Sequence, residues 1–129
     1  MDVIANMLVT LVNAQKVGKE RVVVPYSLFK ESLVGVLQKK GVVHKFKVKA
    51  GDKPKLVIAL DYDEKRLKIG EIKRVSKPGR RIYVTYKELP YCGGRPGFYV
   101  LSTSSGLMDE REAKQRKLGG ELICVVWLK

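Results

Sequence analysis

The stretch Leu101-Ser102-Thr103-Ser104-Ser105-Gly106-Leu107-Met108 places four consecutive hydroxyl side chains and a glycine between two apolar segments. Tyr99 and Val100 precede it, and a polar segment follows from Asp109. Apolar residues that give way to small polar residues and glycine predict a strand that ends in a tight loop. The polar segment then predicts a helix that begins directly after the loop. Such a loop would present hydrogen-bonding groups without charge, which is unusual in a chain as basic as this one.

The first part of the chain predicts the order helix, strand, helix. Residues 3–15 carry apolar side chains at helical spacing, and residues 20–25 form a short β-branched run that ends at a proline. Ser27 is a candidate N-cap for a second helix, which would end near Gly41.

Two strands should follow this second helix. From residue 42 the apolar period becomes two, which predicts a strand over 42–49 with His44 on its covered face. Residues 56–60 predict the neighbouring strand, and the acidic residues 61–64 predict a hairpin tip rather than a metal site. We therefore expect an N-terminal α-β-α-β-β domain, an open three-stranded sheet with two helices on one face.

The second half of the chain predicts a β-rich domain with one short helix. Strands are expected over residues 81–86, 98–101 and 121–128, and a helix over 109–117, where Asp109 and Glu112 have the spacing of a capping box. The fold class is therefore α+β, with an N-terminal domain over 1–66 packed on a C-terminal domain over 67–129.

Charge is concentrated in two segments. The chain has 26 Lys and Arg against 13 Asp and Glu, a net charge of +13. Residues 39–49 contribute five cations and no acid, and residues 65–81 contribute eight cations and one acid, so that these segments account for 5 + 7 = 12 of the excess charges. Clustered cations on a folded chain indicate a phosphate-bearing polymer as partner. An anionic membrane surface is disfavoured, because no expected helix combines a basic face with exposed large apolar residues.

The residues do not support catalysis. The only histidine is His44, and Cys92 and Cys124 stand apart without a Cys-x-x-Cys pair, so neither a catalytic triad nor a zinc site can be assembled. We expect no enzyme, no metal, no cofactor and no small-molecule substrate. Apolar runs stay well below the length of a membrane span, and the first residues do not resemble a secretory signal.

Two features favour nucleic-acid binding. Arg81 and Tyr83 share one face of a predicted strand beside the most basic segment, and an aromatic ring next to a cation suits stacking on bases with pairing to phosphates. The hydroxyl loop could enter a shallow RNA groove and read 2′-hydroxyls and base edges. The alternatives are that Tyr83 packs in the core and that the loop is only a solvated turn.

Several motifs together resemble the bacterial type of the small-subunit ribosomal protein number eight family. The segment Ser102-Thr103-Ser104-x-Gly106-x-Met108, followed by a polar helix and Leu118-Gly119-Gly120-Glu121-Leu122-Ile123-Cys124, is similar to the C-terminal signature of that family. The central turn Arg74-Val75-Ser76-Lys77-Pro78-Gly79-Arg80-Arg81-Ile82-Tyr83 is similar as well. Looser similarity extends to Ile4-Ala5-Asn6-Met7-Leu8 and to Pro25-Tyr26-Ser27 with Lys30.

The resemblance implies a structural constituent of the small ribosomal subunit. Such a protein binds a central-domain stem of small-subunit ribosomal RNA, aids ribosome assembly, and has neighbouring ribosomal proteins and, in some bacteria, its own messenger RNA as further partners. It would reside on the ribosome, in a bacterial cytoplasm or an organelle. The alternative is a non-ribosomal RNA chaperone or an accessory RNA-processing enzyme.

The resemblance, together with the basic segments, also gives a set of candidate RNA-binding residues. The loop contributes Ser102, Thr103, Ser104 and Gly106, and its expected neighbours are Tyr83, Arg81, Gly120 and Glu121. Basic residues of the central segment and two residues at the start of the second helix complete the set: Lys73, Arg74, Lys77, Ser27 and Lys30. This chain departs from the family at Thr10 and Val12, where arginines are usual, and at Ser105, where lysine is frequent.

Overall fold

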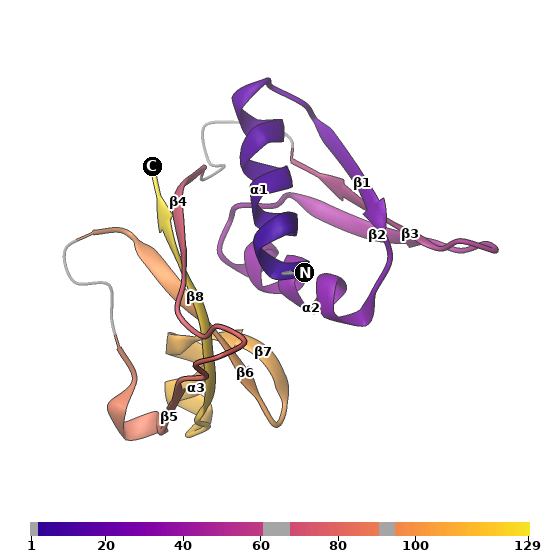
Figure 1. Ribbon diagram of the computed structural model, residues 1–129. Helices are drawn as coiled ribbons and strands as arrows, with labels where there is room; N and C mark the ends of the chain where they lie inside the picture. Colours follow the sequence, from indigo (N-terminus) through magenta and orange to yellow (C-terminus); the bar gives the residue numbers. More distant parts are fainter. Residues whose placement is uncertain (1–2, 61–67, 91–94) are drawn as a thin grey trace. The chain divides into compact units, whose positions relative to one another are not determined.

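The structure, a computed structural model, describes residues 3–60, 68–90 and 95–129. The chain forms two compact units, Met1–Lys68 (unit 1) and Ile69–Lys129 (unit 2), each with its own antiparallel sheet (Figure 1). The expected α+β class is confirmed. The expected boundary between residues 66 and 67, the acidic hairpin tip at 61–64 and Cys92 lie outside the described residues.

Unit 1 has the predicted element order. It consists of α1 (Val3–Lys16), β1 (Arg21–Pro25), α2 (Leu28–Lys39), β2 (Lys45–Lys49) and β3 (Lys55–Ala59). The strand order is β1-β3-β2, so β3 is the central strand and the other two are edges. Both connections that end the helices use glycine in the left-handed region, Gly18 at φ 72° and Gly41 at φ 83°.

The core of unit 1 lies between the two helices and one face of its sheet (Figure 1). Alternate residues of the strands point to this face, and Val22, Leu56 and Ile58 are buried there. The helices bury stripes at helical spacing, which are Ile4, Met7, Leu8, Leu11 and Ala14 of α1 and Leu33, Val34, Val36 and Leu37 of α2. The opposite face of the sheet is therefore open to solvent.

The structure corrects the predicted strand at residues 42–49, which begins only at Lys45. The amides of Val42 and Val43 both donate to the Leu37 carbonyl, at 3.0 and 3.4 Å, so this segment is tied to the end of α2 instead of to a strand. Both valines are fully buried, which breaks the expected alternation. His44 is exposed and not on the covered face, so that prediction was wrong.

Unit 2 is built around its last strand. Its elements are β4 (Ile69–Arg74), β5 (Tyr83–Val84), the 3₁₀ turn η1 (Tyr86–Glu88), β6 (Gly97–Thr103), β7 (Gly106–Asp109), α3 (Glu110–Arg116) and β8 (Gly120–Leu128). The order is β4-β8-β6-β7, and β5 also pairs with β8. The helix α3 contributes Ala113 to a cluster of buried residues, in which the strands supply Leu101, Met108 and Leu122.

The opening stretch is a β-hairpin and not the strand-to-helix loop that we expected. Residues 101–103 belong to β6 and residues 106–108 to β7, with Leu101 directly opposite Met108. The helix starts later, capped by the Asp109 carboxylate, which accepts from the Arg111 amide at 3.3 Å. Sequence reasoning missed β7 because this strand has only four residues, and the last of them is the cap itself.

Two smaller features complete unit 2. The buried Glu110 carboxylate accepts from the Tyr99 amide at 2.8 Å and so fixes α3 to β6. The predicted strand over 81–86 shortens to Tyr83–Val84, because η1 follows at once. Within the described ranges, no helix has the length and apolar character needed to cross a membrane.

Candidate nucleic-acid interface

The candidate site is organised by register across three strands of unit 2. Tyr83 on β5 lies opposite Glu121 on β8, and Glu121 lies opposite Ser102 on β6. We call these three residues the outer row. Neighbouring strands are about 4.8 Å apart, so the backbone positions of Tyr83 and Ser102 are about 10 Å apart. The predicted neighbours of the hydroxyl loop are therefore brought together by the sheet itself.

The outer row faces away from α3. The next row toward the hairpin turn is Val84, Gly120 and Thr103, and Val84 packs against the cluster beneath α3. Because successive residues of a strand alternate, the outer row points to the other side of the sheet. Tyr83 is 69% exposed there, which excludes the alternative that its ring packs in the core.

Glycine at position 120 allows β8 to approach the backbone of β6 closely. A Cβ at Gly120 would collide with the carbonyl oxygen of Ser102, and a Cβ at Gly119 would collide with that of Val84. Gly120 therefore keeps β8 at normal pairing distance from β6 beside the outer row.

An ion pair crosses the outer row. Arg81 Nη1 lies 3.0 Å from Glu121 Oε2, and the Glu121 side chain is only 14% exposed while that of Arg81 is 56% exposed. The hydrogen bond to Glu121, helped by the carboxylate charge, raises the pKa of Arg81 above its usual value. The Glu121 carboxylate thus holds the Arg81 guanidinium beside Tyr83. The remaining N–H groups of this guanidinium can donate to an acceptor on a bound ligand.

The hairpin turn beyond the outer row is fixed by Thr103. Its hydroxyl donates to the Gly106 carbonyl at 2.8 Å and accepts from the Ser105 amide at 3.2 Å. Gly106 has φ 106°, whereas Ser104 and Ser105 avoid positive φ, which is typical of a type I turn closed by a bulge glycine. The predicted residues therefore divide into Thr103 and Gly106, which shape the turn, and Ser104, which it exposes.

Sequence reasoning missed Ser76. It is fully buried, and its hydroxyl accepts from the Ile82 amide at 2.9 Å and donates to the Ile82 carbonyl at 3.3 Å. These bonds close the turn in which Lys77 and Arg80 form an antiparallel bridge, and so they bring Arg81 and Tyr83 alongside β8. A serine directly before a Lys-Pro-Gly turn was the available signal.

The central basic residues do not all join the outer row. Lys73 shares a row with Val125 and Tyr99, on the α3 side of the sheet, and it is exposed. Arg74 lies on the other side, opposite Cys124, and is half-buried. Lys77 is exposed in the turn. The structure therefore distributes these cations around the sheet instead of forming one patch.

The two predicted residues in unit 1 have local partners. The Ser27 hydroxyl caps α2 by accepting from the Lys30 amide at 3.1 Å, and Lys30 Nζ donates to the Pro25 carbonyl at 3.1 Å. Both bonds stabilise the connection from β1 to α2. A role of these residues in binding stays a prediction.

The geometry defines an α+β protein with an exposed aromatic ring, a held guanidinium and a hydroxyl-bearing turn on one side of a sheet. These groups can stack and hydrogen-bond, which is the chemistry of a binding surface. Within the residues the structure describes, no group of three or more His, Cys, Asp or Glu side chains could hold a metal ion.

The chain belongs to the ribosomal protein S8 family, whose model matches residues 2–127. It is 44% identical over 126 residues to "Small ribosomal subunit protein uS8" of Saccharophagus degradans, covering 98% of this chain and 97% of that one. The protein of the same name from Dictyoglomus turgidum is 44% identical over 128 residues, with 98% and 97% covered. That of Dichelobacter nodosus is 40% identical over 126 residues, with 98% of each chain covered.

Membership of this family confirms the resemblance and the main functional predictions. Proteins of this family are structural, non-enzymatic constituents of the small ribosomal subunit, which bind ribosomal RNA and act in translation. The chain is therefore a ribosomal protein and not an enzyme.

Proposed function

We propose that this chain binds a stem in the central domain of small-subunit ribosomal RNA through unit 2 and orders that stem during subunit assembly. The observation that carries the proposal is the outer row, in which Tyr83, Glu121 and Ser102 lie side by side next to the exposed hairpin turn. Neighbouring ribosomal proteins would contact other surfaces. The proposed location is the ribosome of a bacterium or an organelle, and a stem-like segment of its own messenger RNA is a further proposed ligand.

The groups of the site suit a shallow RNA groove. The Tyr83 ring can stack on an unpaired base or ribose, and serine hydroxyls can exchange hydrogen bonds with 2′-hydroxyls and base edges. Arg81, held by Glu121, can add a phosphate or base contact. The general attraction of the chain to RNA phosphates comes from its net charge of +13 and does not depend on this site.

Binding of the intact protein to the central-domain stem and to a shuffled stem, each at two salt concentrations, tests the proposal. Specific recognition predicts tighter binding of the native stem at both salt concentrations, with both RNAs intact afterwards. Tyr83→Ala should weaken native-stem binding by about 1–3 kcal/mol, roughly 5- to 150-fold, while Tyr83→Phe keeps most of the stacking.

Ser104→Ala gives the complementary test. It should weaken binding of the native stem and leave binding of the shuffled stem nearly unchanged, since the hydroxyl contributes shape-specific contacts and no charge. The matched control is Ser32→Ala, on α2 of unit 1. Equal affinity for the two stems in the unaltered protein would overturn the proposal, and so would cleavage or modification of the RNA.

A further inference from the structure

The strand β1 forms a free edge of the unit 1 sheet, because it pairs with β3 on one side only. The Leu60 amide donates to the Glu20 carbonyl at 2.8 Å, so the backbone of Glu20 is directed to the β3 side. In an antiparallel pair, residues bonded to the neighbouring strand alternate with residues whose N–H and C=O groups point away from it. Arg21 and Val23 therefore direct their N–H and C=O groups to the free edge.

The far end of β1 is closed by Pro25. This residue has no N–H, and its carbonyl accepts from Lys30 Nζ at 3.1 Å. The open part of the edge is therefore short and is formed by the backbone of Arg21 and Val23. In the part of the chain that the structure describes, no strand pairs with this edge.

The two edges of this sheet differ in how they are protected against pairing. Both edge strands have five residues, so their lengths do not distinguish them. Lysines on an edge strand disfavour pairing with another chain, and β2 carries three, which are Lys45, Lys47 and Lys49. The strand β1 instead contains the valine run 22–24, in which Val23 is 53% exposed, and its only cation is Arg21 at the first position. The β1 edge thus lacks the protection that the β2 edge has.

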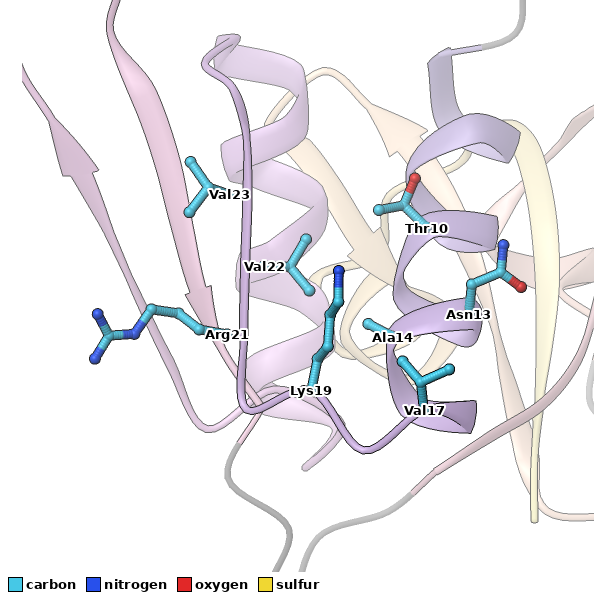
Figure 2. A pocket seen from close by; sticks show the side chains of 8 residues that line it. All are labelled: Thr10, Asn13, Ala14, Val17, Lys19, Arg21, Val22 and Val23. Carbon is cyan, nitrogen blue, oxygen red and sulfur yellow. The ribbon is translucent and has the colours of Figure 1, made fainter.

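A hollow of about 520 Å³ lies between this edge and α1 (Figure 2). Figure 2 shows Val22 and Lys19 directed to the side of β1 that faces α1, and Arg21 and Val23 directed to the other side. On the helix side, the hollow is lined in part by Ala14 and by Val17, which is 71% exposed. There is therefore apolar surface and open space beside the free backbone groups.

The side chains that line the hollow include two cations, Lys19 and Arg21, and no acid. Lys45 lies in the same row as Arg21 across the sheet. None of these three cations forms an ion pair with a described residue. A second copy of this chain would bring a further net charge of +13, which disfavours self-pairing at this edge. An acidic polypeptide has the complementary charge.

We propose that the β1 edge is a docking site for an extended, acidic segment of a protein partner, which adds to the sheet as an antiparallel strand. Backbone hydrogen bonds to Arg21 and Val23 provide affinity, and alternate side chains provide specificity. A partner residue opposite Arg21 or Val23 points to the solvent-facing side of the sheet, where the cations favour an acidic group. The residues between them point toward Ala14, Val17 and Val22, which favour small apolar side chains.

This inference goes beyond the proposed function, because it concerns a polypeptide bound by unit 1 and not RNA recognised by unit 2. The two can fail separately. Val23→Pro should leave the discrimination between native and shuffled stems unchanged, whereas Tyr83→Ala should leave binding of the polypeptide unchanged.

The test uses the full chain, and its probe is a peptide of about eight residues in which glutamate and valine alternate. Amide hydrogen exchange followed by NMR should show that the Arg21 and Val23 amides become protected when the peptide is bound. The Val22 and Val24 amides are already directed to β3 and should change little. Exchange at Arg21 and Val23 that saturating peptide leaves unchanged would overturn the proposal.

Two methylated forms of the peptide separate strand addition from attraction between charges. In antiparallel pairing the glutamates lie opposite Arg21 and Val23, so the glutamate N–H groups donate to β1. N-methylation of the glutamates should abolish binding, while N-methylation of the valines, whose N–H groups point away, should preserve it. Both forms carry the same charge, so equal binding of the two would overturn the proposal.

Val23→Pro removes an outward N–H, and proline is tolerated on an edge strand where the N–H faces solvent. It should weaken peptide binding by roughly 2- to 12-fold for the lost hydrogen bond. The matched control is Val48→Pro on β2. Val48 lies opposite Leu56, whose backbone is directed to β1, so the Val48 N–H points to the other free edge and its loss should not affect binding. Equal losses would overturn the proposal.

Arg21→Gln gives a second test that leaves the backbone intact. It removes a cation beside the docked strand and should weaken peptide binding by up to about 5-fold, the range of exposed ion pairs. An affinity for the peptide equal to that of the unaltered protein would contradict the acidic character of the partner.

Other occupants of the edge give different results. Sedimentation of the unaltered chain should show a monomer, and a dimer that Val23→Pro abolishes would overturn the proposal in favour of a second copy. Protection of the Arg21 and Val23 amides by an unstructured RNA and not by the peptide would overturn it in favour of a nucleic-acid ligand.

Discussion

Gly120→Ala tests whether the outer row depends on close packing of β8 against β6. The new methyl group would meet the Ser102 carbonyl oxygen and the Thr103 Cα, both of which are backbone atoms that no side-chain rotation can move. Gly120 does not have a positive φ, so the penalty is purely steric. The strands must separate by on the order of 1 Å to restore normal contact.

The cost can be worked out from this geometry. Overpacking in a well-packed interior costs about 1–3 kcal/mol, and each weakened backbone hydrogen bond adds about 0.5–1.5 kcal/mol. With one such bond lost, the free energy of unfolding should fall by about 2–4 kcal/mol. For a urea slope of about 2 kcal/mol/M, the middle of the usual range, the unfolding midpoint should drop by about 1–2 M. Affinity for the native stem should fall as well, since Ser102 is displaced from Tyr83.

Urea unfolding followed by circular dichroism measures this change. The matched control is Gly35→Ala, in the interior of α2, where a Cβ meets no atom within 4 Å. It should stabilise the protein by about 0.5–1 kcal/mol, because alanine loses less backbone entropy than glycine in a helix. A midpoint for Gly120→Ala equal to that of the unaltered protein would refute the steric argument.

Three other substitutions separate structural roles from binding roles. Ser76→Ala leaves the Ile82 amide without its buried acceptor and should lower the free energy of unfolding by about 1–3 kcal/mol. A loss below about 0.5 kcal/mol in denaturant unfolding would contradict the role assigned to Ser76. Thr103→Val removes both turn hydrogen bonds and should lower the free energy of unfolding by about 1–2 kcal/mol. Ser105→Ala should change it by no more than about 0.5 kcal/mol, and equal losses for the two variants would refute the structural role of Thr103. Tyr26 donates to Glu31 at 2.9 Å, and this bond raises the pKa of its phenol above 10.0. The unaltered protein should therefore be more stable than Tyr26→Phe below pH 10, and this advantage should disappear as pH rises through the raised pKa. An advantage that grows above pH 10 would disprove the predicted direction of the pH dependence.

Elements with strong local signals were predicted from the sequence. Both helices of unit 1 have apolar stripes and glycine ends, and Ser27 caps α2 as expected. Tyr83 is exposed as the alternation around it predicted, with Ile82 and Val84 half-buried on the other side. In each case the signal lies within a few residues of the structure that it predicts.

The errors occurred where distant contacts decide the structure. β7 has only four residues, and its pairing with β6 was hidden by the polar segment that follows. His44 is exposed because Val42 and Val43 remain tied to Leu37. Ser76 is fixed by a partner six residues away, across a turn. The outer row itself depends on the pairing of β8 with both β5 and β6, which no local pattern specifies.

The position of β8 in unit 2 also sets the order of events during synthesis. This strand covers residues 120–128 and pairs with β4, β5 and β6, so the sheet has no centre until those residues are made. Unit 1 needs nothing beyond residue 68 to complete its own sheet. A growing chain can therefore fold unit 1 first, while the surface proposed to recognise the stem appears only after residues 120–128 have left the ribosome that makes them.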